Sequence, residues 1–157
     1  MIKKEKISTS AGNFFLELYK RYSPSSGATR YEYALKDADQ DEGLPGQVGT
    51  FEFLVPDDNS DYAIADDVYL EPPYRNQNLY RTILSHAKDF FKSIGLKGVM
   101  SKGRSRSSDA TKSWEKIKTR KEESPEIYNG HKFVDMYLEN KNSSKRIMTF
   151  NQFKNNI

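Results

Sequence analysis

The spacing of apolar residues changes near residue 75, and this change constrains the fold of the chain more than any other feature. Between residues 13 and 71, apolar and aromatic side chains recur at about every second position in short segments, which is the period of β-strands. After residue 78 they recur at every third or fourth position, which predicts one buried face of an amphipathic helix. That face would consist of Leu79, Ile83, Ala87, Phe90 and Ile94.

Four predicted strands precede the helix, with turn-forming or acidic segments between them. They cover residues 13–22, 30–37, 47–56 and 62–71. Because the connections are short, the four strands should form an antiparallel meander. Asp66 and Asp67 interrupt the last of these strands and predict a β-bulge there.

A short apolar segment, residues 96–101, comes directly after the helix and predicts a further strand. Gly95, between the helix and this strand, suits the C-terminal cap of the helix. A strand, a helix and a second strand make a βαβ unit, so the strands at 62–71 and 96–101 should be parallel.

The rest of the chain predicts one more helix and one or two strands. We expect the helix over residues 107–123 with Ser107, Ser108 or Asp109 near its cap, and then a turn at "SPEIYNG". Strands are expected at 131–140 and at 145–153. The predicted fold class is therefore α+β, with a mixed β-sheet in which an antiparallel N-terminal meander is followed by a βαβ crossing and a second helix.

The composition excludes several classes of site. The chain has 157 residues, which suits a single domain over residues 1–157, and we expect flexible ends near residues 1–8 and 150–157. Without cysteine there is no disulfide, thiolate metal site or cysteine nucleophile, and His86 and His131 alone do not suggest zinc. We recognise no signal peptide and no run of about 18 apolar residues, so we expect a cytoplasmic protein that does not enter a membrane.

The charge of the chain is unevenly distributed. Residues 1–70 hold 7 basic and 13 acidic residues, whereas residues 71–157 hold 18 basic and 9 acidic ones. A basic C-terminal half suits a partner that carries phosphates, which could be a nucleotide-like cofactor or a nucleic acid. A solvated lysine surface is the alternative interpretation.

Two stretches carry a resemblance to a known family. In "YLEPPYRNQNLYRTIL", Leu70, Pro72 and Arg75 match a strand end of the form Val-x-Pro-x-x-(Gln/Arg)-x-x-Gly-x-(Gly/Ala) that opens a helix. In "SSDATKSWEKI", Ser107 and Ala110 occupy the first two marked positions of an Asn-x-x-Ala-x-x-x-Tyr helix. Together with the order of elements, these stretches resemble the GNAT N-acetyltransferase superfamily.

The resemblance implies a site for acetyl-CoA at the start of the first helix. In the family this turn cradles the pyrophosphate, because a helix start presents unpaired N–H groups and a partial positive charge. The preceding strand would bind the pantetheine arm through its backbone. The cofactor-binding residues implied here are Leu70, Arg75, Asn76, Gln77, Asn78, Leu79, Tyr80 and Ser107.

The sequence departs from the family pattern at four points. Asn78 and Tyr80 replace the two glycines, and of these Asn78 tolerates a left-handed backbone better than most residues. The ring of Tyr80 could cover the cofactor or could fill its site. Trp114 replaces a tyrosine that often acts as the general acid, and an indole cannot donate a proton at a useful pKa. Only "RYSPSSGAT" lies where the family has two helices.

An acyltransferase of this kind would move an acyl group, here acetyl, from CoA directly to an amine acceptor. The reaction needs a base for the ammonium proton and backbone N–H groups for the oxyanion. Glu71 at the strand end is the first candidate for the base, and Asp66 and Asp67 are weaker candidates.

Two alternatives stay open from the sequence. One is a catalytically degenerate GNAT-like fold that serves as a binding or structural module for a protein partner, for example in a phage or a multi-subunit assembly. The other is a nucleic-acid-binding domain that uses the basic half of the chain.

Overall fold

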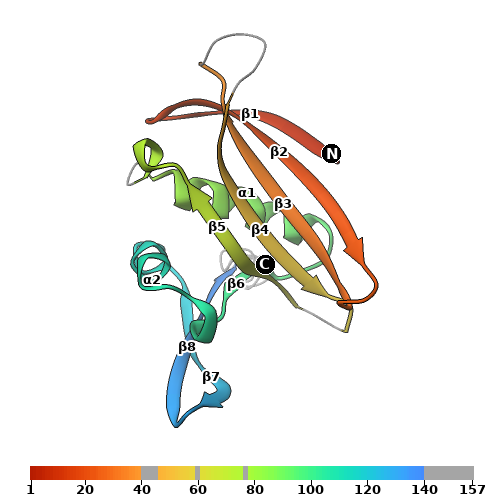
Figure 1. Cartoon of the computed structure of the whole chain (residues 1–157), viewed down its shortest axis with the longest axis vertical. Coiled ribbons are helices and arrows are strands. Elements are labelled where there is room, and N and C mark those ends of the chain that lie inside the picture. Colours follow the sequence, from red (N-terminus) through yellow and green to blue (C-terminus); the bar gives the residue numbers. More distant parts are fainter. Residues whose placement is uncertain (40–45, 59–60, 76–77, 140–157) are drawn as a thin grey trace, which may run out of the picture.

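The computed structural model of the chain describes residues 1–39, 46–58, 61–75 and 78–139. This part of the chain forms one sheet of eight strands and two α-helices (Figure 1). The strands are β1 (Lys3–Thr9), β2 (Gly12–Ser23), β3 (Ala28–Asp37), β4 (Gln47–Pro56), β5 (Tyr62–Leu70), β6 (Gly98–Ser101), β7 (Arg120–Tyr128) and β8 (His131–Glu139). The helices are α1 (Leu79–Ser93) and α2 (Ser108–Glu115), with 3-10 turns η1 (Pro72–Tyr74) and η2 (Gly103–Ser105).

The strands lie in the order β1-β2-β3-β4-β5-β6-β8-β7. Strands β1 to β5 are antiparallel neighbours, which confirms the predicted meander. Strands β5 and β6 are parallel, which confirms the βαβ unit around α1. Figure 1 shows β1–β5 fanned out at one end of the molecule and the β7–β8 hairpin projecting at the other.

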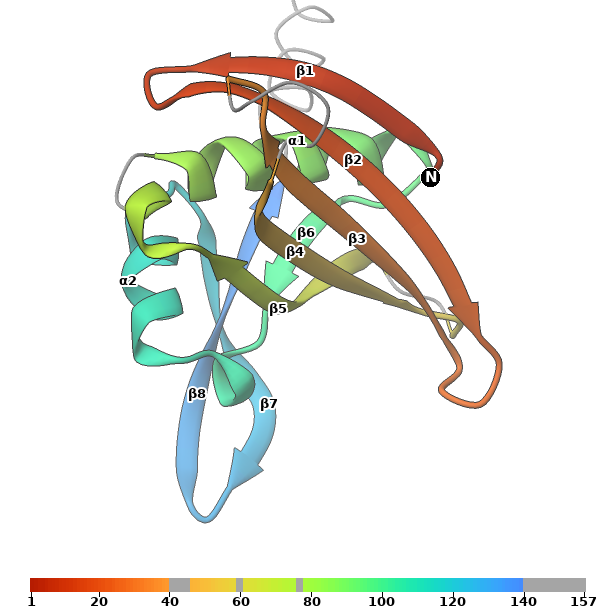
Figure 2. The ribbon, with the colours of Figure 1, turned by 45° about the horizontal axis from the view of Figure 1, so that its top comes forward.

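Helix α1 crosses one face of the β1–β5 sheet and closes the main core (Figure 2). Its buried residues are Leu79, Ile83, Leu84, Ala87 and Phe91. The ring of Phe91 makes edge contacts with Tyr31 and Phe53, at centroid distances of 5.1 and 5.4 Å. Ile94 was expected on this face but is exposed, because α1 ends at Ser93 and the chain turns away at Gly95 (φ 102°). Large aromatic side chains thus fill the core of a chain with few aliphatic residues.

The predicted bulge in β5 is confirmed. Glu52 of β4 pairs with Asp67, and the next residue, Phe53, pairs with Ala65. Asp66 is therefore the extra residue on β5, and both aspartates are exposed. A bulge re-aims the side chains beside it, which here brings two carboxylates together on one strand.

Strand β1 was not predicted from the sequence. Its first four residues are three lysines and one glutamate, and among its residues only Ile7 is buried. The strand forms an edge of the sheet, where charged side chains discourage pairing with another chain. Its charges therefore hid the period-2 pattern that identified β2 to β5.

The prediction of a helix over 107–123 was wrong beyond Glu115, and the predicted turn over 124–130 lies mostly in β7. The true turn is Asn129–Gly130, where both residues have positive φ. The sequence "KTRKEE" has helix-forming composition, but β7 is the other edge strand and exposes Lys121, Glu122 and Glu123 to solvent. Pro125 is tolerated there because the register shifts between Glu123 and Ile127. The strand predicted at 145–153 lies outside the described residues.

Neither described helix combines the length and the apolarity that crossing a membrane would require.

Candidate acyl-CoA site

Strands β5 and β6 pair only where they begin. Residues 62–64 pair with residues 98–100, after which β6 ends at Ser101 and the chain turns into η2. Strand β5 continues to Leu70, and its edge on this side pairs with no strand in the described part of the chain. The sheet therefore opens into a V-shaped split whose β5 side carries free backbone groups.

A cavity of about 950 Å³ lies in this split. Its walls come from three parts of the chain: residues 65–70 of β5, the start of α1, and the segment from η2 to the end of α2. It is large enough for a drug-sized ligand. Its charged lining residues are Asp66, Asp67, Arg75, Arg81, Arg106, Asp109, Lys112, Glu115 and Lys116.

The start of α1 presents backbone N–H groups that have no hydrogen-bond acceptor among the described residues. Asn78 precedes the helix in the left-handed conformation (φ 63°, ψ 7°) and lines the cavity. The first helical bond runs from the Thr82 N–H to the Asn78 carbonyl at 3.1 Å. The N–H groups of Leu79, Tyr80 and Arg81 precede that bond, so the helix itself offers them no acceptor. A helix start of this kind attracts anions. Asn76 and Gln77 lie outside the described residues.

Arg75 connects the turn before α1 to the end of β5. Its Nε donates to the carbonyl oxygen of Leu70 at 2.7 Å, and its guanidinium lies 5.6 Å from the ring centre of Tyr69. The side chain is exposed and lines the cavity. Arg75 thus presents a positive charge where β5, η1 and α1 converge, a position suited to a phosphate.

Tyr80 and Trp114 form one wall of the cavity. The Tyr80 ring packs against Phe51 at a centroid distance of 5.4 Å. The Trp114 indole, which is 1% exposed, donates from Nε1 to the Tyr80 hydroxyl oxygen at 3.1 Å. Burial raises the pKa of Tyr80, while the Trp114 N–H and the charge of Arg106 act in the opposite direction. The sequence allows the Tyr80 ring either to cover the cofactor or to fill its site. In the structure the ring is turned inward against Phe51, and the cavity remains beside it.

Ser107 is the N-cap of α2. Its Oγ accepts from the Ala110 N–H at 3.1 Å, and its carbonyl accepts from the Thr111 N–H at 2.9 Å. The residue also lines the cavity. Its side-chain oxygen is therefore committed to the helix, and Ser107 shapes the cavity mainly by fixing where α2 begins.

Arg106 holds this wall to the sheet and was not predicted from the sequence. Its guanidinium donates to the Thr111 hydroxyl at 3.1 Å, to the Ser101 carbonyl at 3.1 Å and to the Val134 carbonyl at 2.7 Å. Burial lowers the pKa of Arg106, and Asp135 and Glu115 counteract that effect. Its position beside the cap Ser107 was the available signal, but the loop "KGRSRSS" fits a solvated turn equally well.

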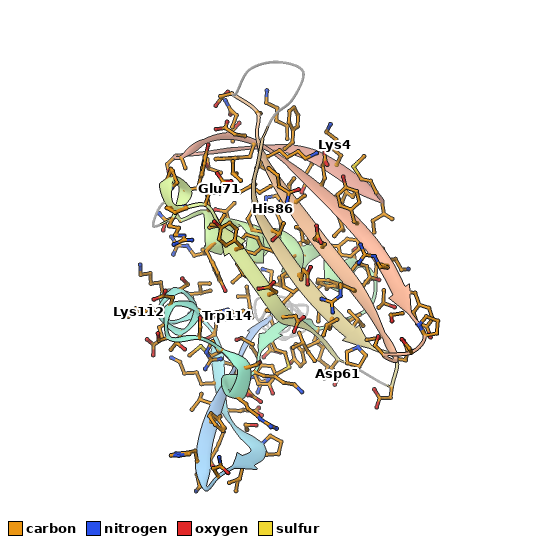
Figure 3. All side chains as sticks on the ribbon, viewed as in Figure 1. Lys4, Asp61, Glu71, His86, Lys112 and Trp114 are labelled. Carbon is orange, nitrogen blue, oxygen red and sulfur yellow. The ribbon has the colours of Figure 1, made fainter. Side chains whose placement is uncertain are left out.

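The three candidate bases are placed differently. Asp66 and Asp67 both line the cavity, whereas Glu71 is exposed beyond the end of β5 and does not. Figure 3 shows Glu71 beside η1, away from Trp114 and Lys112 on α2. Asp66 is already bound to Arg30 at 3.1 Å. Within the described residues Asp67 has no ion-pair partner, so the geometry favours Asp67 over Glu71 as a base.

The fold was compared with known proteins. No protein family matches the sequence, and no curated protein is similar to it in sequence. Solved structures with a similar fold include the following two. A protein assigned as an acyl-CoA N-acyltransferase from Klebsiella pneumoniae has 10% identity and a TM-score of 0.55, over 77% of this chain and 94% of that one. IAA acetyltransferase from Bacillus cereus has 13% identity and a TM-score of 0.51, over 80% and 99%.

At such low identity the comparison establishes the fold alone. The mixed sheet and the two described helices are consistent with that fold. This chain has the fold of the GNAT N-acetyltransferases, in a divergent form.

Proposed function

We propose that this protein is an acyl-CoA-dependent N-acyltransferase that transfers acetyl from acetyl-CoA to an amine. The observation that carries the proposal is the cavity in the β5–β6 split, bounded at one end by the start of α1. A thioester cofactor with an amide-bearing arm and a pyrophosphate needs both an open strand edge and a cluster of N–H donors.

The residues around the cavity fit the parts of acetyl-CoA. The edge of β5 up to Leu70 offers backbone groups to the amides of the pantetheine arm. The N–H groups at the start of α1 and the guanidinium of Arg75 suit the pyrophosphate. Lys112 and Lys116 on the opposite wall suit a further phosphate.

The reaction would take place beside the bulge of β5. The acceptor amine must lose a proton before or as it attacks the thioester. Asp67 lies on β5 at the bulge and has no ion-pair partner among the described residues, so it is suited to accept that proton. Backbone N–H groups on the open edge of β5 are suited to stabilise the negative oxygen that develops on the carbonyl.

The proposal is tested by calorimetric titration of acetyl-CoA into the protein and its Arg75→Ala variant. We expect the wild type to bind and the variant to lose about tenfold in affinity, the contribution of one charge-assisted phosphate contact. Arg21→Ala is the matched control, since Arg21 is an exposed arginine on β2 outside the lining of this cavity, and its affinity should equal that of the wild type. No binding at millimolar acetyl-CoA would overturn the proposal.

A binding or structural module without catalysis is the second candidate. Two observations favour it: the inward Tyr80–Trp114 pair occupies part of the split, and no helix lies between β1 and β5 in residues 1–39, 46–58 and 61–70 to wall an acceptor site. This candidate predicts the absence of acetyl-CoA binding in the same titration.

A nucleic-acid binder is the weakest candidate. Three arginines that contribute to the basic character of the chain are engaged within the protein. Arg30 contacts Glu52 and Asp66, Arg106 contacts three groups of β6, α2 and β8, and Arg120 contacts Glu139. Salt-dependent binding of DNA or RNA without acetyl-CoA binding would favour this candidate.

A further inference from the structure

Acyl transfer from a thioester leaves behind a group that needs a proton. As the new C–N bond forms, the C–S bond breaks and the sulfur takes the bonding electrons. The thiol formed from it has an ordinary pKa of about 8.5, so a proton donor beside the sulfur eases its departure at neutral pH. The inference of such a donor rests on the proposed function, because the donor would serve the same reaction in the same cavity.

We propose that the Tyr80 hydroxyl is the proton donor to the departing sulfur and that the Trp114 indole orients it. An indole N–H can only donate a hydrogen bond. Since Trp114 Nε1 donates to the Tyr80 oxygen at 3.1 Å, one lone pair of that oxygen is occupied and its own O–H must point elsewhere. Among the described residues no acceptor takes this O–H, and both side chains line the cavity.

The other hydroxyl groups of the cavity are worse placed for this task. The serine hydroxyls that line the cavity are aliphatic alcohols and far weaker acids than a phenol; two of them, Ser101 and Ser107, also accept hydrogen bonds from Arg106 and from the Ala110 N–H, each at 3.1 Å. Tyr69 is 52% exposed and lies under the guanidinium of Arg75, at the phosphate end of the cavity. Tyr80 is thus the half-buried phenol whose hydrogen is available toward the interior of the cavity.

The surroundings of Tyr80 suit both halves of a proton transfer. Burial raises the pKa of Tyr80 above its ordinary value, so the phenol is protonated at neutral pH. After it gives up the proton, the Trp114 N–H and the positive charge of Arg106 stabilise the phenolate. Solvent returns a proton to Tyr80, and Asp67 passes the proton lost by the amine to solvent. The one proton that the amine loses therefore equals the one proton that the thiol gains.

The test compares the binding of two cofactor probes: CoA, and desulfo-CoA, which lacks the terminal sulfur. At pH 9 most of the CoA thiol is ionised while Tyr80 stays protonated, so the hydroxyl can donate to the thiolate. We expect the wild type to bind CoA about tenfold more tightly than desulfo-CoA at pH 9, and only about twofold more tightly at pH 6.5.

Tyr80→Phe should bind both probes equally at both pH values. Trp114→Phe, which keeps Tyr80 but removes the N–H that orients it, should retain only part of the preference and serves as the second variant if Tyr80→Phe does not fold. Tyr69→Phe is the matched control and should keep the full preference. An unchanged preference in Tyr80→Phe, or none in the wild type, would overturn the inference alone. If the wild type binds neither probe, the proposed function falls with it.

Discussion

At the scale of single residues, the proposed reaction depends on which carboxylate meets the acceptor amine. The bulge in β5 brings Asp66 and Asp67 to the cavity, but Arg30 binds Asp66 at 3.1 Å. Glu71 lies beyond the strand end and outside the cavity lining. Neutralising a general base typically costs a factor of about 10² or more in rate, whereas a bystander carboxylate costs almost nothing.

We therefore predict that Asp67→Asn lowers kcat/KM at least tenfold and that Glu71→Gln leaves it within about twofold. The measurement is thiol release from acetyl-CoA in the presence of a panel of primary amines. The affinity for acetyl-CoA should stay unchanged in both variants, which separates loss of the base from loss of the cofactor site. A larger loss in Glu71→Gln than in Asp67→Asn would restore Glu71 as the base.

At the scale of secondary structure elements, Glu17 joins three strands at the edge of the sheet. Its buried carboxylate on β2 accepts from the Tyr19 hydroxyl at 2.6 Å and pairs with Lys36 of β3 at 3.0 Å and Lys4 of β1 at 3.6 Å. The hydrogen bond from Tyr19 and the charges of both lysines lower the pKa of Glu17, against the effect of burial. A carboxyl whose pKa is lowered by folding stabilises the protein above its ordinary pKa and loses that effect as the pH falls.

Because folding lowers the pKa of Glu17, we predict that Glu17→Gln lowers the free energy of unfolding by about 1–2 kcal/mol at pH 7. The difference from the wild type should shrink as the pH falls below about 4.5. Urea denaturation at a series of pH values measures both quantities. Glu32→Gln, on the neighbouring strand β3, is the control and should change the unfolding free energy by less than about 0.5 kcal/mol. A cost for Glu17→Gln that persists unchanged at pH 3 would contradict this role.

The elements that the sequence predicted are those with one buried face. Strands β2 to β5 bury apolar or aromatic residues on one face, and α1 repeats apolar residues at helical spacing. The edge strands β1 and β7 were missed because their side chains are mostly charged and exposed, so no hydrophobic period marks them. In β7 the helix-forming residues after Glu115 were overruled by pairing with β8, which local sequence cannot reveal.

The same limit applies to the candidate site. The turn before α1 could be predicted because Pro72 and Arg75 stand at fixed spacings in the sequence. The contact between Tyr80 and Trp114 joins residues 34 positions apart, and it depends on where α2 packs. The positions of Glu71 and Asp67 relative to the cavity depend on the register shift in β5, which the sequence indicated only as a bulge.

At the scale of the whole molecule, the central feature is that one sheet holds together at one end of β5 and β6 and opens at the other. The antiparallel β1–β5 layer joins the β7–β8 hairpin through the short β5–β6 pairing and through Tyr62 of β5, which contacts Arg120 of β7 and Tyr137 of β8 (Figure 2). The opening lies where residues 65–70, α1 and α2 converge, so a ligand bound there contacts both halves.

The most direct test of the β5–β6 split as the cofactor site is a map of backbone amide shifts in ¹H–¹⁵N spectra as acetyl-CoA is added. We predict the largest shifts at residues 65–70 of β5 and at Leu79, Tyr80 and Arg81, with little change in β1 or at the tip of the β7–β8 hairpin. An absence of shifts at saturating acetyl-CoA, or shifts centred on the hairpin, would contradict the central claim that acetyl-CoA binds in this split.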